Sequence, residues 1–255
     1  MVIHLSVCNI NTIFAIYFFN LKYNHTLAKL YLIPTSLHEN DTFTISNADA
    51  AIVSSIRTFI VENEKSARRV LRAYVPLPQL ELLPLNEHTQ PEQFYNYLAA
   101  CKEGLDVGLL SDCGCPAVCD PGADIVAMAH TLGIEVVPMV GPSSILLALM
   151  ASGLSGQKFE NNGYVPIKEP DRQKKIREIE NKSRVENSTQ IFIEAPYRNH
   201  QLFEVLLKTL RPQTRLCIAV NINTPNAIIK TKEVAQWQKS KPDINKKPCV
   251  FLLMA

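Results

Sequence analysis

Short apolar runs alternate with longer amphipathic stretches along most of this chain, beginning near residue 29. Short apolar runs predict buried strands, and apolar positions at helical spacing predict helices that cover a sheet. In chain order we expect a strand at residues 30–33, a strand at 50–54, a helix at 66–74, a proline-rich connection at 75–84, a helix that opens at Thr89-Gln90-Pro91-Glu92, and a strand–helix–strand–helix block over 106–152. Right-handed crossovers between such elements give a parallel sheet.

The pattern breaks at residues 153–157 and then resumes with a different character. The second set comprises an extended segment at 162–166, a highly charged helix at 169–184, a strand at 190–193, a helix at 197–210, a strand at 216–220, an extended segment at 226–230 and a closing strand at 250–253. We therefore predict an α/β protein of two domains. Residues 28–154 form an N-terminal parallel sheet flanked by helices, and residues 155–255 form a mixed sheet with helices.

Residues 1–27 stand apart from both patterns, since they are rich in Asn and aromatic residues. Their apolar run, residues 13–19, is too short to span a bilayer, and it lacks the basic start and cleavage site of a secretory signal. We expect an N-terminal extension that is disordered or loosely packed, and no membrane association.

Two loops rich in Gly, Pro and Ser follow neighbouring strands of the first domain. The first reads SDCGCPAVCDPG over residues 111–122, and the second reads GPSS over 141–144. Gly permits close backbone approach, Pro fixes φ, and Ser can cap the next helix. Ordinary turns use the same residues. Because the carboxyl ends of parallel strands are where open α/β sheets bind ligands, the two loops together predict a pocket.

Composition narrows the function classes only a little. The chain is 47% apolar and 20% charged, with a net charge of +2, which is typical of a globular protein and not of a strongly basic nucleic-acid binder. Its 7 cysteines are scattered and odd in number, which favours a reducing cytoplasm over a disulfide framework. Cys113, Cys115 and Cys119 lack an evident fourth ligand, so we expect small thiols in a tight loop and no metal site.

Several nucleotide-binding and catalytic motifs are missing from the sequence. It contains no G-x-x-x-x-G-K-[ST] phosphate loop, no G-x-G-x-x-G after a strand and no G-x-S-x-G elbow. A nucleotide-binding oxidoreductase or transferase is therefore disfavoured. The expected pocket suits a neutral or zwitterionic ligand.

Five segments together carry a resemblance to a known family. They are LYLIPTSL, FIVENEKSARRVL, the long block GLLSDCGCPAVCDPGADIVAMAHTLGIEVVPMVGPSSILLALMASGL, GYVP and IFIEAPYR. In this order and spacing they resemble the tetrapyrrole methylase superfamily of S-adenosylmethionine-dependent methyltransferases. Within it the chain is most similar to the ribosomal small subunit methyltransferase I branch, which methylates a ribose 2′-hydroxyl of 16S rRNA.

The resemblance implies a cytoplasmic, homodimeric enzyme of two domains that binds S-adenosylmethionine in the cleft between them. Carried over position by position, it assigns the donor-binding residues to the loops and to the second domain. They are Pro34, Thr35, Asp112, Gly114, Cys115, Val118, Ser143, Ser144, Ile145, Ala195 and Pro248. Asp112 has an equally good alternative role, which is to hold its own turn.

A ribose hydroxyl must lose a proton when it attacks a methyl group, so a carboxylate base is expected. The candidates are Glu62 and Glu194. Glu194 has a structural alternative, a buried ion pair with Arg198. Basic residues on and before the charged helix are candidates for contact with RNA phosphates, although they alternate with acidic residues: Lys168, Arg172, Lys174, Lys175 and Arg177.

The chain departs from the family pattern at several points. PTSLHEND lacks the usual glycine of the first loop, Cys115 replaces a Thr, and Glu62-Asn63 stands where Glu-Asp-Thr-Arg is usual. The late segment AVNINTPNAIIKTKEVAQW lacks the Glu-Leu-Thr-Lys of the rRNA enzymes. Two alternatives therefore stay open, namely methylation of a tetrapyrrole or other small acceptor, and a catalytically inactive regulator that binds S-adenosylmethionine.

Overall fold

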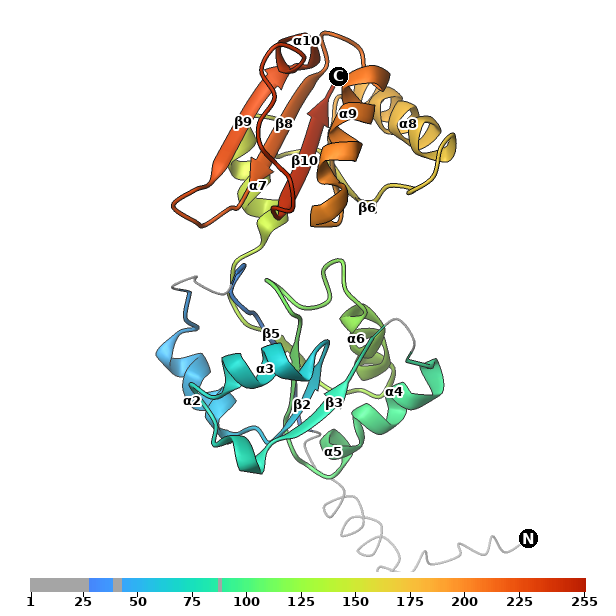
Figure 1. Ribbon diagram of the computed structural model, residues 1–255. Coiled ribbons are helices and arrows are strands. Elements are labelled where there is room, and N and C mark those ends of the chain that lie inside the picture. The colour runs from blue at the N-terminus through green and yellow to red at the C-terminus, as the bar shows by residue number, and fades with distance from the viewer. Residues whose placement is uncertain (1–27, 39–42, 87–88) are drawn as a thin grey trace, which may run out of the picture. The chain divides into compact units, whose positions relative to one another are not determined.

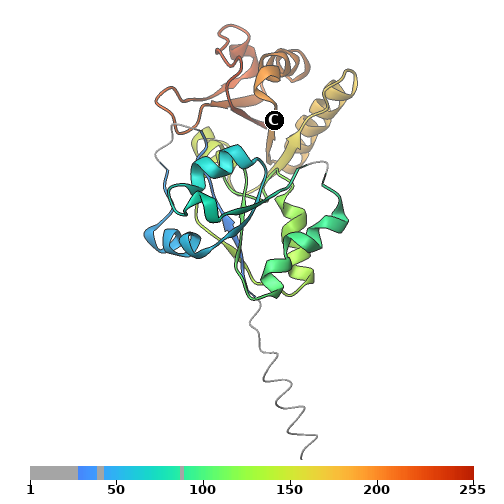
Figure 2. The same ribbon diagram turned by 60° about the horizontal axis from the view of Figure 1, so that its bottom comes forward.

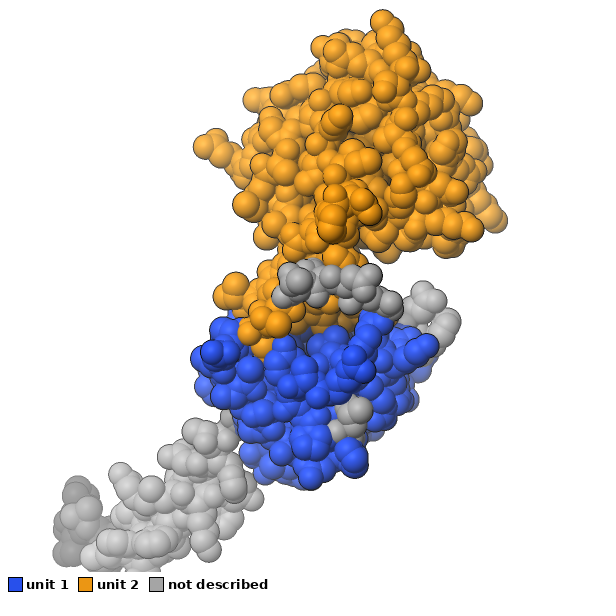
Figure 3. Space-filling view, turned by 60° about the vertical axis from the view of Figure 1, so that its left-hand side comes forward, with its two compact units in different colours: residues 1–33, 46–110, 120–139 blue, residues 34–45, 111–119, 140–255 orange. Residues whose placement is uncertain are grey.

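A computed structural model describes residues 28–38, 43–86 and 89–255, and the expected N-terminal extension, residues 1–27, lies outside them. The chain divides into two compact units (Figure 3). Unit 1 comprises residues 1–33, 46–110 and 120–139, and unit 2 comprises residues 34–45, 111–119 and 140–255. No helix among the described residues has the length and apolar character needed to cross a membrane.

Unit 1 contains a five-stranded sheet in the order β3-β2-β4-β1-β5, in which all four adjacent strand pairs are parallel. Its strands are β1 (Leu30–Ile33), β2 (Thr58–Val61), β3 (Glu81–Pro84), β4 (Val107–Leu110) and β5 (Val136–Pro138). The central strands β2 and β4 are buried at every position, whereas β3 and β5 are partly exposed edges. This confirms the predicted parallel sheet, since strands covered on both faces are apolar throughout.

Helices cover both faces of this sheet (Figures 1 and 2). They are α2 (Asn47–Ser55), α3 (Glu64–Leu71), α4 (Pro91–Tyr97), α5 (Ala99–Lys102) and α6 (Gly122–Thr131), with a short 3₁₀ turn, η1 (Leu77–Gln79). Phe94 and Leu98 pack with Ile125 and Ala129 over one face. The chain moves toward the β3 edge through α2 and α3 and returns through α4, α5 and α6, so right-handed crossovers put the two groups on opposite faces.

Two sequence expectations in unit 1 are wrong. Residues 50–54 were expected to be a strand and instead lie inside α2, where Ser46 caps the helix by accepting a hydrogen bond from Asp49 N. Only Val53 of this helix is buried, so α2 packs against the rest of unit 1 through a narrow apolar stripe. Residues 81–84, expected to be a connection, form the edge strand β3 beside β2. An edge strand tolerates the proline at its end.

Unit 2 contains the predicted mixed sheet, in the order β6-β7-β10-β8-β9 (Figure 1). The strands are β6 (Phe159–Tyr164), β7 (Thr189–Ile193), β8 (Arg215–Val220), β9 (Ile228–Glu233) and β10 (Cys249–Met254). Only the β6–β7 pair is parallel, and the other three pairs are antiparallel.

Alternate residues of the central strand β10 supply two separate cores. Phe251 and Leu253 pack under α8 (Asp171–Glu186), α9 (Asn199–Thr209) and α10 (Val234–Trp237). Val250 and Leu252 face the other way and pack with α7 (Ser144–Ser152). This alternation follows from the period of two in a strand. A 3₁₀ turn, η2 (Pro196–Arg198), joins β7 to α9.

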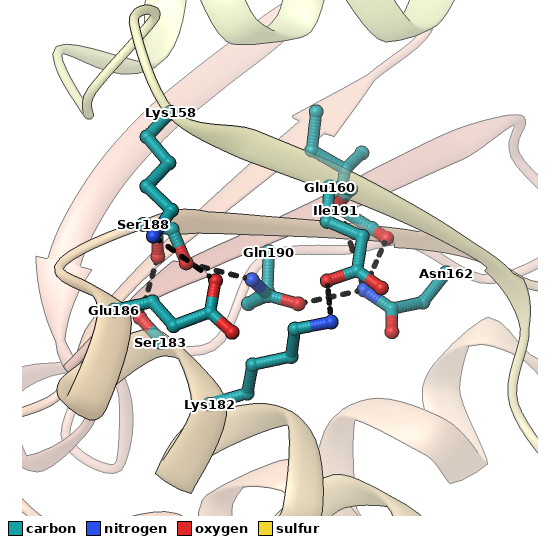
Figure 4. Close-up of polar contacts among 9 residues, drawn as sticks. All are labelled: Lys158, Glu160, Asn162, Lys182, Ser183, Glu186, Ser188, Gln190 and Ile191. Carbon is teal, nitrogen blue, oxygen red and sulfur yellow. Dashed lines mark hydrogen bonds and ion pairs between the residues drawn. The ribbon is translucent and has the colours of Figure 1, made fainter.

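Polar contacts join the edge strand β6 to β7 and α8 (Figure 4). Lys182 pairs with Glu160 at 2.6 Å, and Lys158 pairs with Glu186 at 3.2 Å. Beneath these pairs, the buried Gln190 amide accepts a hydrogen bond from Asn162 Nδ2 at 3.0 Å. Lys182 and Glu186 of α8 are therefore each matched by an opposite charge on or next to β6.

Candidate functional site

The segments that follow β1 and β4 are joined to each other within unit 2. Thr35 N donates a hydrogen bond to Gly114 O at 2.9 Å. The Thr35 hydroxyl donates to Ser111 O at 3.3 Å. Because Thr35 is only 3% exposed, these bonds are shielded from water and fix the start of the first loop against the second. Thr35, a proposed donor ligand, thus also has a structural function.

The segment that follows β5 joins the same group of loops. Cys115 Sγ donates to Pro142 O at 3.3 Å and lies 3.7 Å from Gly141 O. A Cβ atom on Gly141 would lie 2.1 Å from Pro34 Cβ, a distance that real Cβ atoms do not show. The close approach of the first and third loops therefore depends on glycine at this position. The structure thus brings together the loops that the sequence predicts to be neighbours.

Gly114 occupies the point where all three segments meet. Its φ is +79°, and a Cβ built there would lie 3.2 Å from Pro142 O and 3.3 Å from Leu37 Cδ2. Two non-glycine residues of the same loop, Ala117 and Cys119, also have positive φ, at 65° and 64°. Left-handed backbone at such residues persists where the surroundings hold it, and it is common at ligand-binding loops.

The proposed donor-binding residues differ in how far they are exposed to solvent. Pro34, Thr35, Gly114 and Ile145 are buried, Cys115, Ser143, Ser144 and Ala195 are partly buried, and Asp112, Val118 and Pro248 are exposed. Val118 is 48% exposed, which is high for a valine in a tight loop. The buried members shape the loops, and the exposed members leave side chains available at the surface.

The two serines of the third loop have different partners. Ser143 Oγ accepts from Leu146 N at 3.4 Å and is the N-cap of α7. The Ser144 hydroxyl, by contrast, makes no hydrogen bond to any residue that the structure describes. It is therefore available to a ligand near the positive end of the α7 dipole.

The loop cysteines are free thiols rather than a bridge. Burial raises the pKa of the Cys115 thiol above its ordinary value, so Cys115 is a neutral hydrogen-bond donor near neutral pH. Asn161 Nδ2 lies 3.0 Å from Cys119 Sγ, which ties the far end of the loop to β6. Within the described part of the chain, no three His, Cys, Asp or Glu side chains are grouped to hold a metal ion.

The carboxyl end of β7 belongs to the same region of unit 2. Ile193 packs against the core cluster that contains Leu37 from the first loop and Ile145 from the start of α7. The antiparallel register pairs Val250 with Ile193. Ala195 comes two residues after the end of β7 and Pro248 directly precedes β10, so both lie near the same end of this strand pair.

Glu194 lies at this end of β7 with a side chain that is fully buried. Its Oε1 accepts from Arg198 Nη2 at 2.6 Å, from Arg198 Nε at 2.9 Å and from Ala195 N at 2.7 Å. Its Oε2 is buried and has no hydrogen-bond partner among the described residues. The hydrogen bond to Glu194 raises the pKa of Arg198, so the guanidinium remains charged. The expected ion pair is present, and it uses only one carboxylate oxygen.

A second buried acceptor lies nearby in the sequence, at the start of α9. Asn199 donates from Nδ2 to Lys247 O at 2.6 Å, while its Oδ1 is buried and has no partner in the described ranges. Leaving a buried acceptor unpaired costs about 1–3 kcal/mol. Glu194 Oε2 and Asn199 Oδ1 are therefore candidates to accept a hydrogen bond from a substrate.

Glu62, the other candidate base, is placed differently. It directly follows β2 in unit 1 and is exposed, whereas every other candidate lies in unit 2. The basic cluster expected on α8 also needs a correction. Arg172 is 1% exposed, donates from Nε to Pro166 O at 2.9 Å and also donates to Ile167 O, so it cannot contact RNA.

Two residues near the loops were missed from sequence. Leu37 belongs to the core beside α7, and Cys113 Sγ lies 3.2 Å from its carbonyl oxygen. His38 Nε2 is buried without a partner among the residues described. The only related signal in the sequence is that the first loop, PTSLHEND, lacks the usual glycine.

Comparison with known proteins identifies the family. The model of the Tetrapyrrole (Corrin/Porphyrin) Methylases matches residues 44–235, about three quarters of the chain. A curated relative from Vibrio cholerae, named ribosomal RNA small subunit methyltransferase I, is 29% identical to this chain. The match covers 74% of this chain and 63% of that protein. The relative of the same name in Bacillus subtilis is 28% identical, over 71% of this chain and 59% of that protein. The matched part spans less than two thirds of these relatives.

Solved structures show the same fold at low sequence identity. The methyltransferase CobJ superposes with a TM-score of 0.59 at 17% identity, covering 89% of this chain and 94% of that one. The uroporphyrin-III-C-methyltransferase from Thermus thermophilus superposes with a TM-score of 0.51 at 18% identity, covering 89% and 92%. By its family match, its two sheets and its joined loops, this chain belongs to the tetrapyrrole (corrin/porphyrin) methylase family.

Proposed function

We propose that this protein is an S-adenosylmethionine-dependent methyltransferase that methylates a ribose 2′-hydroxyl of 16S rRNA. The family supports the reaction class, and the names of the curated relatives support the substrate. The structural observation that supports the proposal most strongly is the joining of the three loops around Gly114. We propose that backbone groups and small side chains of these loops form the binding surface for S-adenosylmethionine.

The residues present fit a zwitterionic donor. Gly114 has no side chain at the point where the loops meet, the Ser144 hydroxyl is without a partner in the described chain, and Val118 offers an exposed apolar side chain. We propose that these residues hold the donor, together with the backbone of the other carried-over positions. When bound, S-adenosylmethionine supplies an activated methyl group on a sulfonium.

The acceptor hydroxyl must lose a proton to the protein or to water. We propose Glu194 as the base, with Oε2 as the atom that takes the proton from the hydroxyl oxygen. Arg198 and Ala195 N bind Oε1 and thereby orient Oε2. Asn199 Oδ1, also buried and unpaired in the described chain, is proposed to accept a hydrogen bond from the substrate. Glu62 is the alternative base in unit 1.

A second function has a specific observation in its favour. The first loop lacks the glycine that is usual in the family, and it contains His38, whose Nε2 is buried and has no hydrogen-bond partner among the described residues. An altered first loop suits a different acceptor, such as a tetrapyrrole or another small molecule, or a protein that binds the donor without catalysis. We also propose a cytoplasmic location. We further propose a homodimer, and light scattering of the purified chain tests this oligomeric state.

The proposal is tested in two steps. Calorimetry with S-adenosylmethionine measures donor binding, with NAD as the control ligand. Transfer of tritiated methyl groups to 16S rRNA, taken from a strain that lacks the modification, then measures activity, and primer extension at low nucleotide concentration locates the methylated ribose. Donor binding without methyl transfer to rRNA would favour the regulator or the small-acceptor enzyme.

A further inference from the structure

A pocket of about 320 Å³ opens between α8 and the end of α9 in unit 2. Its lining residues are mainly basic or polar, namely Arg177, Glu180, Asn181, Arg184, Thr209 and Arg211. Arg177, Asn181 and Arg184 share one face of α8, because they lie four and then three residues apart. The volume lies near the lower end of the range for small-ligand sites, about 300–1,000 Å³.

The guanidinium groups of this pocket are not neutralised. Arg184 Nη2 donates to Asn181 Oδ1 at 2.7 Å, and Arg177 Nη2 donates to Gln173 Oε1 at 3.2 Å. Among the described residues, neither side chain nor that of Arg211 forms an ion pair with a carboxylate. On the β6 side of the same helix, by contrast, Lys182 is paired with Glu160 (Figure 4). Arg177 and Arg184 of α8 thus bring unmatched positive charge to the pocket.

Glu180 is the one carboxylate in the lining, and it is engaged by the protein. It is 7% exposed, and its Oε1 accepts from Arg211 N at 2.8 Å and from Thr214 Oγ1 at 2.5 Å. These bonds fix the backbone of Arg211 beside the pocket. Three guanidinium groups against one carboxylate leave the lining with a net positive charge of two.

The pocket is separate from the proposed catalytic region. Glu194 and Arg198 precede α9, whereas Thr209 and Arg211 lie at and beyond its end. The 11 residues of α9 span about 16 Å at 1.5 Å per residue. A ligand here cannot take part in methyl transfer, but a long polymer could occupy both places.

We propose that this pocket binds a phosphodiester group of RNA, at a position distant from the methylated nucleotide. Arg is the side chain best suited to phosphate, because its planar guanidinium donates two parallel hydrogen bonds. Thr209 and Asn181 add neutral donors. The choice of RNA over a free phosphate ion rests on the proposed rRNA function.

The test compares two double variants that remove equal charge from the full chain. R184A/R211A removes two pocket guanidiniums, and K208A/K239A removes two exposed ammonium groups outside the pocket, one on α9 and one after α10. Fluorescence anisotropy measures binding of a labelled stem-loop from 16S rRNA between 50 and 200 mM KCl. We expect R184A/R211A to weaken binding roughly tenfold at low salt and to reduce the slope of log K against log salt by about one, the effect of one lost phosphate contact.

The K208A/K239A control is expected to change affinity by less than about threefold, and R184K/R211K to retain most of the salt slope while losing affinity. Equal losses in both alanine variants would overturn the proposal, as would a wild-type protein that binds no RNA. Binding of inorganic phosphate to the pocket, with RNA affinity unchanged in R184A/R211A, would also overturn it.

Activity separates this proposal from the function on which it rests. If the wild-type protein methylates 16S rRNA and R184A/R211A binds RNA normally, the proposed function stands and the proposed RNA site in the pocket is wrong. If the wild-type protein binds RNA through the pocket but transfers no methyl group, the RNA site stands and the proposed activity is wrong. S-adenosylmethionine affinity is expected to be the same in all variants.

Discussion

Arg198 binds a single oxygen of Glu194 and leaves the second oxygen buried and unpaired within the described chain. Both guanidinium contacts, at 2.6 and 2.9 Å, go to Oε1. A buried carboxylate that served only an ion pair is expected to have both oxygens bonded, since an unpaired charged atom away from water is costly. The arrangement therefore suits a carboxylate that is oriented by one oxygen and acts through the other.

Replacing Glu194 with Gln tests this assignment. The change preserves shape but removes the proton acceptor, so we expect methyl transfer to fall by roughly 10²–10⁴-fold. Affinity for S-adenosylmethionine is expected to stay within about threefold in calorimetry. Glu62→Gln is the matched control, and a larger loss in that variant would move the catalytic role to unit 1.

Replacing Arg198 with Ala tests the orientation of Glu194. The single variant leaves a buried carboxylate without its partner, so its urea midpoint should fall. The double variant E194Q/R198A removes the uncompensated charge and should be more stable than R198A. If the two variants unfold at the same urea concentration, the ion pair contributes little and Glu194 is held by other contacts.

Replacing Ser144 with Trp tests the donor site directly. Ser144 has no hydrogen-bond partner among the described residues and lies at the start of α7, so an indole there should occupy the proposed binding surface for S-adenosylmethionine. We expect the dissociation constant for S-adenosylmethionine to rise by at least about tenfold. Ser54→Trp, at an exposed position of α2, is the control. Unchanged donor affinity in S144W would show that Ser144 has been wrongly carried over from the family.

Replacing Gly114 with Ala tests the close approach of the loops. Both Gly114 and Gly153 have positive φ, but a Cβ would meet Pro142 O and Leu37 at Gly114 and nothing within 4 Å at Gly153. Gly153→Ala should therefore cost only the left-handed strain, about 1–2 kcal/mol. Gly114→Ala should lower the free energy of unfolding further and weaken donor binding. Equal costs would mean that the loops are not held against each other.

Alkylation of the cysteines tests the pKa of Cys115. Burial raises this pKa, so at pH 8 a smaller fraction of Cys115 than of an ordinary thiol is the reactive thiolate, and its rate should continue to rise as the pH is increased above 9. Cys113 and Cys119 are exposed and should react first with iodoacetamide. Mass spectrometry assigns the sites. Faster modification of Cys115 than of Cys119 would contradict a buried, neutral thiol.

Sequence predicted the parts of the fold where local pattern and tertiary packing agree. The buried strands β4 and β10 are apolar throughout, and the helix at Pro91 has both a capping residue and an early proline. It failed at residues 50–54, where Ala, Val and Ser fit a strand and a helix equally well and the Ser46 cap decides. The edge strand β3 was missed because its burial is partial and it contains proline.

The candidate site was predicted in its loops but not in its details. Gly, Pro and Ser at the ends of β4 and β5 indicate turns, and the proposal that these turns bind the donor rests on the resemblance to the family. The asymmetric contact of Arg198 with Glu194, by contrast, depends on side-chain geometry that spacing does not encode. The pocket with Arg211 joins α8 to a loop more than twenty residues away, so only the fold could bring it together.

The most direct test of the proposed activity is methyl transfer to 16S rRNA that lacks the modification. Purified protein is incubated with that rRNA and tritiated S-adenosylmethionine, and the labelled position is located by primer extension at low nucleotide concentration. We expect label in the rRNA and one specific primer-extension stop at a 2′-O-methylated ribose. Both are expected to be lost in E194Q. No label in the rRNA, from protein that binds S-adenosylmethionine, would contradict it.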